Sequence, residues 1–233
     1  MNNNIYYPMI TGNMKMVELI RSDYRFLLTL SRFNIPLGFG NSTIEQLCKA
    51  NNVDLKTFLM VVNKLDGNDK NDDDNLEGIN LNQLIMFLKN THSYFFEYRL
   101  PLLQELLSKI VDGAEPVHKA LLIDFFDKYD SEVRKHMLFE EKNVYPYVEN
   151  CINKIHSSKY TIDYFEQHHN DIEKKINDLR NIIIKYLPPL ENINVVNDML
   201  YMLFQAEDDL NRHTLIEEKV LFPCVRKIES SIN

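Results

Sequence analysis

Four long stretches of this sequence repeat apolar residues at steps of three and four, and this periodicity constrains the fold most strongly. They span roughly residues 80–111, 116–149, 159–187 and 194–228. Such steps place apolar side chains on one face of an α-helix. Short connections make successive helices antiparallel, so the sequence predicts an all-α, up-down-up-down four-helix bundle.

Pro101 lies inside the first stretch, and it is expected to kink that helix near Glu97. In the second stretch, the predicted apolar stripe begins with Leu121, Phe125 and Tyr129. These residues are therefore expected in the bundle core.

The composition fits a helical chain and excludes several classes of protein. The 233 residues include six glycines and eight prolines, too few for the turns of an all-β protein. A net charge of -8 disfavours nucleic-acid binding, which needs a surplus of lysine and arginine. The sequence shows neither a secretory signal nor an apolar run long enough to span a membrane. Three widely spaced cysteines, Cys48, Cys151 and Cys224, are typical of a reducing interior, so we expect a cytoplasmic protein.

A polar, acidic segment, GNDKNDDDNLEG, divides the chain at residues 67–78. A calcium-binding loop starting at Asp66 is disfavoured, because Asn71 stands where such a loop requires glycine. We predict a linker at 67–78, which separates a small helical N-terminal domain at 1–66 from the bundle at 79–233.

The N-terminal region has three helix signals. The segment MKMVELIRSDYRFLLTLSRF predicts a first helix, the run Ser42 to Glu45 predicts a capping box for a second, and Asp54 predicts the cap of a third. Between the first two, NIPLGFGN predicts a sharp turn. A DNA-binding helix-turn-helix also fits this pattern, but the near-neutral charge disfavours it.

Each of the four predicted helices carries a histidine on its apolar stripe, and two carry a glutamate one turn later. Residues four apart share a helix face, and counting from the turns places the four histidines level to within about one turn. Burying these groups unpaired would be costly, although a hydrogen-bonded core without metal is the alternative. The predicted metal ligands are His92, His136, Glu140, His169, His213 and Glu217. His168, beside His169, is the less favoured candidate on the third helix.

Four imidazoles and two carboxylates exceed what one four-coordinate zinc ion needs. They match two metal ions bridged by the two glutamates, and this mixed ligand set suits iron or manganese. An oxo or hydroxo bridge would complete such a centre. The ferritin-like signature is Glu-x-x-His, whereas the order here is His-x-x-x-Glu, so that class is disfavoured.

These motifs resemble those of a known family. The segment His136 to Glu141 followed by Val144-Tyr145-Pro146, and the segment His213 to Glu217 followed by Leu221-Phe222-Pro223, are similar to the paired H-x-x-x-E-E/N-x-x-L-F-P motifs of hemerythrin-like di-iron domains. The segments starting at His92 and His169 resemble the corresponding parts of the repair-of-iron-centres proteins. The resemblance covers about 80–228, and its doubled motif is specific.

The N-terminal region resembles the small N-terminal domain of the same proteins, with one departure. Where that family has an adjacent cysteine pair in the turn, this chain has Leu37-Gly38-Phe39-Gly40. Cys48 remains on the next predicted helix, but one thiol cannot form an internal dithiol pair. A thiol-dependent step is therefore not expected of this chain.

The resemblance implies a non-haem di-iron protein of the nitrosative or oxidative stress response that helps to restore damaged iron-sulfur clusters by supplying iron. Both glutamates would bridge the irons, and O2, NO or peroxide would be the small ligands. A sensor that signals through the N-terminal domain and an NO or peroxide reductase are the alternatives. The implied partners are damaged iron-sulfur proteins, with no nucleic acid and no membrane, and a homodimer is one option for the oligomeric state.

Overall fold

The computed structural model describes residues 9–67, 76–112, 115–155, 161–166, 172–186 and 193–232. Within these ranges the regular elements are all helical, and Lys15 and Thr43 form an isolated antiparallel bridge. The predicted all-α class is confirmed. Among the described residues, no helix combines the length and apolarity needed to cross a lipid bilayer.

Within the described residues, the four predicted bundle stretches are helical, and the described helices begin and end close to the predicted bounds. The first comprises α5 Leu81–Tyr94, the π-helix η1 Phe95–Arg99 and α6 Leu100–Val111. The second comprises α7 Pro116–Phe139, the π-helix η2 Glu140–Val144 and α8 Tyr145–Ile152. The third includes α9 Ile162–Glu166 and α10 Ile172–Tyr186. The fourth comprises α11 Ile193–Ile216, the π-helix η3 Glu217–Leu221 and α12 Phe222–Ile232.

Contacts along the chain define two compact units. The first unit comprises Met1–Asn90, Tyr147–Asp163 and Thr214–Asn233, and the second comprises Thr91–Pro146 and Tyr164–His213. The domain boundaries predicted at 67–78 stay a prediction, because residues 68–75 lie outside the described ranges.

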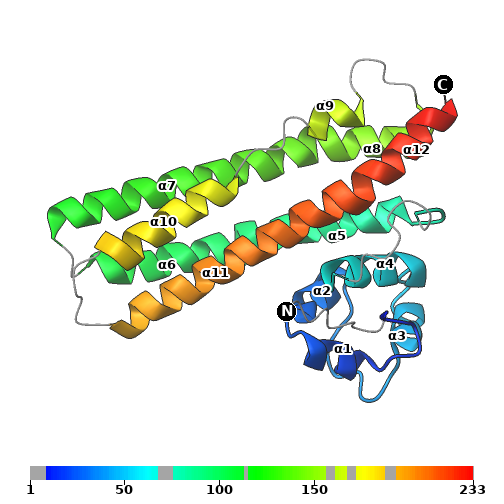
Figure 1. Ribbon diagram of the computed structural model, residues 1–233, viewed down its shortest axis with the longest axis horizontal. Helices are drawn as coiled ribbons and strands as arrows, with labels where there is room; N and C mark the ends of the chain where they lie inside the picture. The colour runs from blue at the N-terminus through cyan, green and yellow to red at the C-terminus, as the bar shows by residue number, and fades with distance from the viewer. Residues whose placement is uncertain are drawn as a thin grey trace, which may run out of the picture. The chain divides into compact units, whose positions relative to one another are not determined.

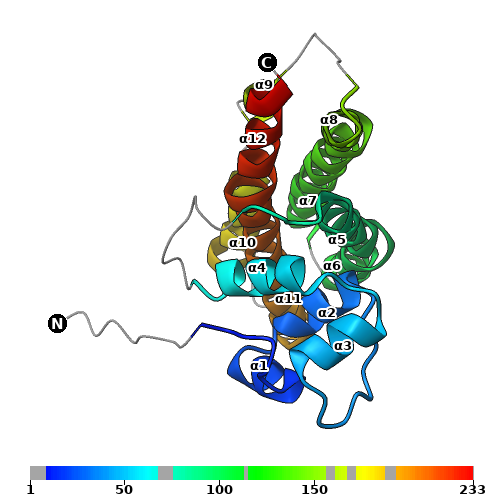
Figure 2. The ribbon, with the colours of Figure 1, turned by 90° about the vertical axis from the view of Figure 1, so that its right-hand side faces the viewer.

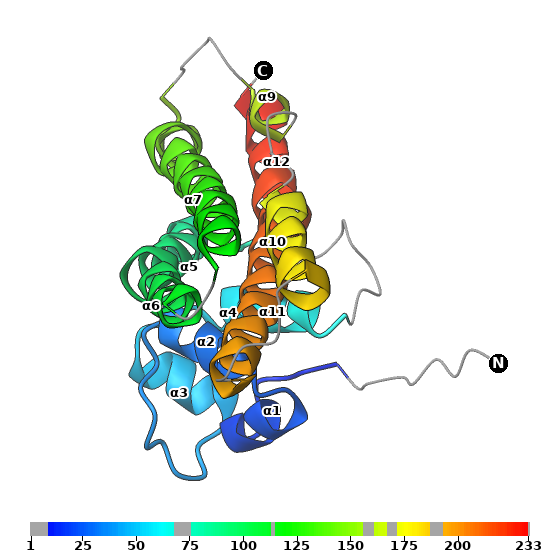
Figure 3. The ribbon, with the colours of Figure 1, turned by 90° about the vertical axis from the view of Figure 1, so that its left-hand side faces the viewer.

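The second unit is built on α6, α7, α10 and α11, which run alongside one another in Figure 1 and occupy four corners in Figure 3. Helix α7 packs against both α6 and α10. Arg180 of α10 forms an ion pair with Glu207 of α11, and Arg99 of η1 donates a hydrogen bond to Gln205 of α11 at 3.2 Å. The buried core between the helices includes Leu103, Tyr129, Val133, Leu179, Met199 and Leu203.

The first unit contains the N-terminal helices α1 Met16–Ser22, α2 Phe26–Arg32, α3 Ile44–Ala50 and α4 Leu55–Leu65, which group together in Figure 2. The ring of Phe33 packs between Phe58, at 5.3 Å between centroids, and Phe87 of α5, at 4.9 Å. The Asn90 side chain of α5 donates a hydrogen bond to the Arg32 carbonyl at 2.7 Å. The N-terminal region therefore packs directly against α5.

Two of the N-terminal helix predictions need correction, and one is confirmed. The single helix expected from MKMVELIRSDYRFLLTLSRF is broken into α1 and α2, because Asp23 is extended and its carboxylate accepts a hydrogen bond from the Arg25 backbone. The capping box lies one residue later than predicted, between Thr43 and Gln46. Asp54 caps α4 as predicted.

Candidate metal centre

The three described histidine-bearing helices each contain a π-helical turn soon after the histidine. Elements η1, η2 and η3 follow His92, His136 and His213, and each π-helix ends two residues before a proline. Proline cannot donate the usual backbone hydrogen bond and collides with the carbonyl four residues earlier, so a regular α-helix is disfavoured there. Near Glu97, where a kink was predicted, the helix contains the π-helical turn η1. Isolated π-helical turns are frequent at functional sites.

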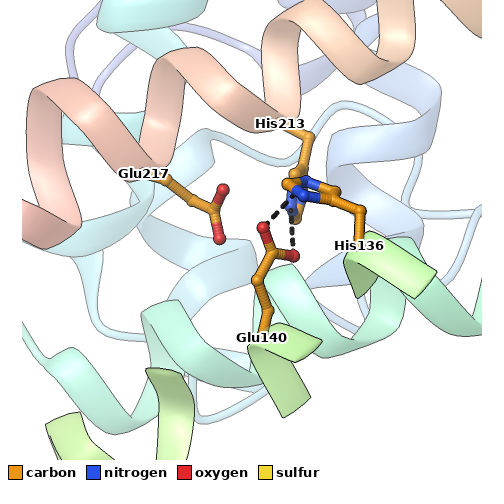
Figure 4. A group of neighbouring side chains, drawn as sticks. All are labelled: His136, Glu140, His213 and Glu217. Atoms are coloured by element: carbon orange, nitrogen blue, oxygen red, sulfur yellow. Dashed lines mark ion pairs between the residues drawn. The ribbon is translucent and has the colours of Figure 1, made fainter. Parts of the chain in front are cut away.

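Four of the predicted ligands converge in one buried group, drawn in Figure 4. The group consists of His136, Glu140, His213 and Glu217, and one donor atom from each lies within 4.8 Å of those of the others. The distance from His136 Nε2 to Glu140 Oε1 is 2.8 Å, and that from His213 Nε2 to Glu140 Oε2 is 3.5 Å. All four side chains are buried.

His92 adjoins this group from α5 and is itself fully buried. Its Nε2 atom lies 3.1 Å from Glu140 Oε2 and 3.4 Å from His213 Nε2. Its Nδ1 atom lies 3.0 Å from Glu141 Oε1. Since a carboxylate only accepts, Nδ1 donates to Glu141, and Nε2 is the ring nitrogen that faces Glu140 and His213. With Nδ1 held in this way, Nε2 is the atom that would bind a metal ion.

The structure thus brings together five of the six predicted ligands: His92, His136, Glu140, His213 and Glu217. The sixth, His169, and the alternative His168 lie outside the described residues. His118 does not join the group: it is half-buried near the start of α7, about 27 Å along the helix from His136. Metal ligation by these residues stays a prediction.

Sequence reasoning missed two residues of this site, Glu141 and Tyr145. The Glu141 carboxylate orients His92, as described above. The Tyr145 hydroxyl lies 3.2 Å from His92 Nε2, and its fully buried ring stacks on that imidazole with centroids 5.5 Å apart. The doubled glutamate of the His-x-x-x-Glu-Glu motif was a signal for Glu141. The tyrosine in the position of the motif's phenylalanine was a signal for Tyr145.

The donor set fits a bound cation. Carboxylates buried in a bundle interior are costly unless positive charge compensates them. Here Glu140 and Glu217 are 1% and 0% exposed, and imidazole nitrogens surround the Glu140 carboxylate. Imidazole and carboxylate together suit iron, manganese or zinc. The buried histidine and glutamate group therefore has the chemistry of a metal centre.

Two comparisons relate the chain to known proteins. Residues 83–225 match the family model described as the Hemerythrin HHE cation binding domain. The chain is also similar to the Iron-sulfur cluster repair protein ScdA of Staphylococcus haemolyticus (strain JCSC1435), with 22% identity over 187 residues, which cover 78% of this chain and 84% of that protein. The hemerythrin-like resemblance inferred from the motifs is confirmed. Since the family model spans more than half of the sequence and includes the whole buried histidine and glutamate group, the chain belongs to the hemerythrin HHE cation-binding family.

Proposed function

We propose that this chain is a non-haem di-iron protein that supplies iron for the repair of iron-sulfur clusters damaged by nitrosative or oxidative stress in the cytoplasm. The observation that carries the proposal is the buried group of His136, Glu140, His213 and Glu217 in an HHE-family bundle. Similarity to a protein named for iron-sulfur cluster repair supports cluster repair as the function. The proposal includes His92 and His169 as further ligands, with both glutamates bridging the two irons.

The chain's own residues have distinct parts in this proposal. Glu141 holds the His92 ring by its Nδ1 proton, so that Nε2 stays directed at Glu140 and His213. Val144, Val220 and Leu221, which follow the two glutamates along η2 and η3, are buried as well. A bound iron pair would supply coordination positions for O2, NO or peroxide.

Iron, rather than a thiol, is the reactive group that the described residues favour. The turn that carries cysteines in the related family contains Leu37 and Phe39 here. Burial raises the pKa of the Cys48 thiol to about 12, with a smaller contribution from Asp54. A neutral thiol is a poor nucleophile.

The test is transfer of iron to a cluster protein. The chain is loaded anaerobically with ferrous iron and mixed with an apo-ferredoxin and a sulfide source, and cluster assembly is followed by visible absorption. We expect assembly with the wild-type chain and with His118→Ala, a histidine control on the same helix, but not with His136→Ala. Iron that stays bound while no cluster forms would contradict the repair function.

A sensor is the second candidate, because α5 carries His92 and also contacts the N-terminal region. Asn90, two residues before His92, donates a hydrogen bond to the Arg32 carbonyl, and Phe87 packs on Phe33. A ligand-dependent shift of α5 would therefore also displace α2. Reversible NO binding without iron transfer, together with changed amide hydrogen exchange at residues 26–35, would favour sensing. Steady turnover of NO or peroxide with a reductant would instead identify a reductase.

A further inference from the structure

A buried arginine connects two of the helices that carry predicted metal ligands. Arg99 of η1 is 2% exposed, and its Nη1 atom donates hydrogen bonds to Gln205 Oε1 at 3.2 Å and to Met202 Sδ at 3.4 Å. Both acceptors lie on α11. The guanidinium carbon also lies 5.2 Å from the centre of the Tyr94 ring. One polar side chain therefore bridges the first bundle stretch and α11.

Burial of this arginine is costly for the fold. Within the described ranges Arg99 forms no ion pair with a carboxylate, and its Nε atom is buried without a hydrogen-bond partner. A guanidinium removed from water without a counter-ion lowers stability, and an apolar residue of similar volume often stabilises such a position equally well or better. Stability alone therefore does not account for an arginine at this position.

The Arg99–Gln205 bridge and the His92–His213 pair connect the same two bundle helices. Arg99 follows His92 by seven residues, and Gln205 precedes His213 by eight. Residues at these spacings share a helix face and lie about 10–12 Å apart along the axis, so the two connections are nearly level on both helices. The Nε2 atoms of the two histidines lie 3.4 Å apart. The bridge is therefore a second contact between the helices that bring His92 and His213 together.

A polar bridge can fix how far one helix slides along another. Apolar packing tolerates small shifts between helices, whereas a single buried polar residue can select one register at a cost in stability. Metal ligands have to be held within about 0.5 Å of their binding geometry by the residues around them. Without the bridge, the separation of His92 and His213 would vary more than a metal centre tolerates.

We propose that Arg99 is a positioning residue of the metal centre, which fixes the register of the first bundle stretch against α11 through Gln205 and so holds His92 and His213 at their binding separation. The inference rests on the proposed metal centre and adds a residue that determines its metal affinity. Arg99 is separated from His92 by about 10 Å along the helix, so it acts through the helices and not on the metal itself.

The test separates metal affinity from stability in Arg99→Met. Methionine is unbranched, fills irregular space and packs well on an aromatic ring such as that of Tyr94. The affinity of the full-length protein for ferrous iron is measured anaerobically by competition with a chelator. The stability of the metal-free protein is measured by urea unfolding, because bound metal would itself add stability. We expect the iron Kd to rise about tenfold, whereas the free energy of unfolding should equal or exceed that of the wild type.

Gln205→Leu breaks the same bridge from its exposed end. It should raise the iron Kd as Arg99→Met does, and the double variant should bind iron no more weakly than either single variant, because both remove one shared contact. Gln104→Leu is the matched control. Gln104 is exposed on α6 and forms no hydrogen bond with another described helix, so its iron Kd should equal that of the wild type.

An unchanged iron Kd in Arg99→Met and Gln205→Leu would overturn this inference alone. A lower free energy of unfolding in metal-free Arg99→Met would also overturn it, since Arg99 would then stabilise the bundle as a whole. A wild-type chain that holds no iron would overturn the proposed function and this inference together.

Discussion

At the scale of single residues, Glu141 controls the direction of His92. Its carboxylate is partly exposed, whereas the imidazole that it holds is fully buried. Carboxylates that orient histidine ligands typically contribute about 10- to 100-fold to metal affinity. We expect Glu141→Gln to lose iron to a competing chelator at a concentration about tenfold lower than the wild type requires.

The control for this substitution is Glu149→Gln. Glu149 forms an exposed ion pair with Lys89 at 3.0 Å and is expected to leave chelator competition unchanged. Equal iron retention by Glu141→Gln and the wild type would show that His92 needs no carboxylate to orient it.

The cysteine thiols are a second residue-level test, with a defined pH dependence. Burial raises the pKa of Cys48 to about 12 and that of Cys224 to about 11, from an ordinary value of 9.0. The stability gained by keeping these thiols neutral is fully present below pH 9 and is lost as pH rises through the folded-state values. At pH 8, iodoacetamide should label Cys48 and Cys224 slowly in the folded protein and rapidly in denaturant, as measured by mass spectrometry. Equally fast labelling in both states would contradict the burial of these thiols.

Helical spacing predicted the five gathered site residues but not Glu141 or Tyr145. Residues four apart share a helix face whatever the fold, so the pairs His136–Glu140 and His213–Glu217 could be inferred from the sequence. The contacts of Glu141 and Tyr145 with His92 cross between helices. They depend on the path of the chain through η2, which spacing rules for a regular α-helix do not describe.

At the scale of helices, the cap of α4 can be tested directly. The Asp54 carboxylate accepts hydrogen bonds from the Thr57 backbone at 2.8 Å and from the Thr57 hydroxyl at 2.6 Å. Asp54→Ala should lower the free energy of unfolding in urea by about 1 kcal/mol, whereas Asp54→Asn, which keeps a capping oxygen, should retain most of it. Identical unfolding midpoints for the Ala variant and the wild type would show that this cap does not stabilise α4.

The ends of the described bundle helices were predictable to within a few residues, but the apolar stripe predicted for α7 was wrong. Leu121 is 40% exposed, and Phe125 is only partly buried, whereas Leu122 and Phe126 are 1% and 2% exposed. Two successive steps of four back from Tyr129 drift about 80° around the helix, whereas a step of three followed by a step of four stays on the buried face. The error therefore came from the spacing assigned to the apolar residues before Tyr129, whereas the helix itself was correctly predicted.

At the scale of the whole molecule, packing of the N-terminal region on α5 should contribute to overall stability. Phe87 is 1% exposed, its ring lies 4.9 Å from that of Phe33, and the Arg32 guanidinium lies 5.8 Å from it. Phe87→Ala should lower the free energy of unfolding by about 3 kcal/mol, as measured by circular dichroism in urea. Tyr24→Ala is the control, because Tyr24 is 65% exposed and its loss should change stability little. A stability loss no larger than that of the control would contradict tight packing at Phe87.

The extent of the N-terminal region's packing could not be predicted from the sequence. The acidic segment at 67–78 suggested a separate small domain, and composition alone gives no contact between distant segments. The pairing of Phe33 with Phe87 and of Arg32 with Asn90 joins residues more than fifty positions apart. Periodicity describes one helix at a time, so it cannot reveal such pairs.

A di-iron centre in the bundle can be tested by the metal content and visible spectrum of the anaerobically purified protein. We expect about two iron ions per chain and, after oxidation, the absorption of an oxo-bridged ferric pair. We also expect loss of iron in His136→Ala and Glu217→Ala with the helical content retained. Fewer than about one iron per chain, or unchanged iron binding in both variants, would contradict it.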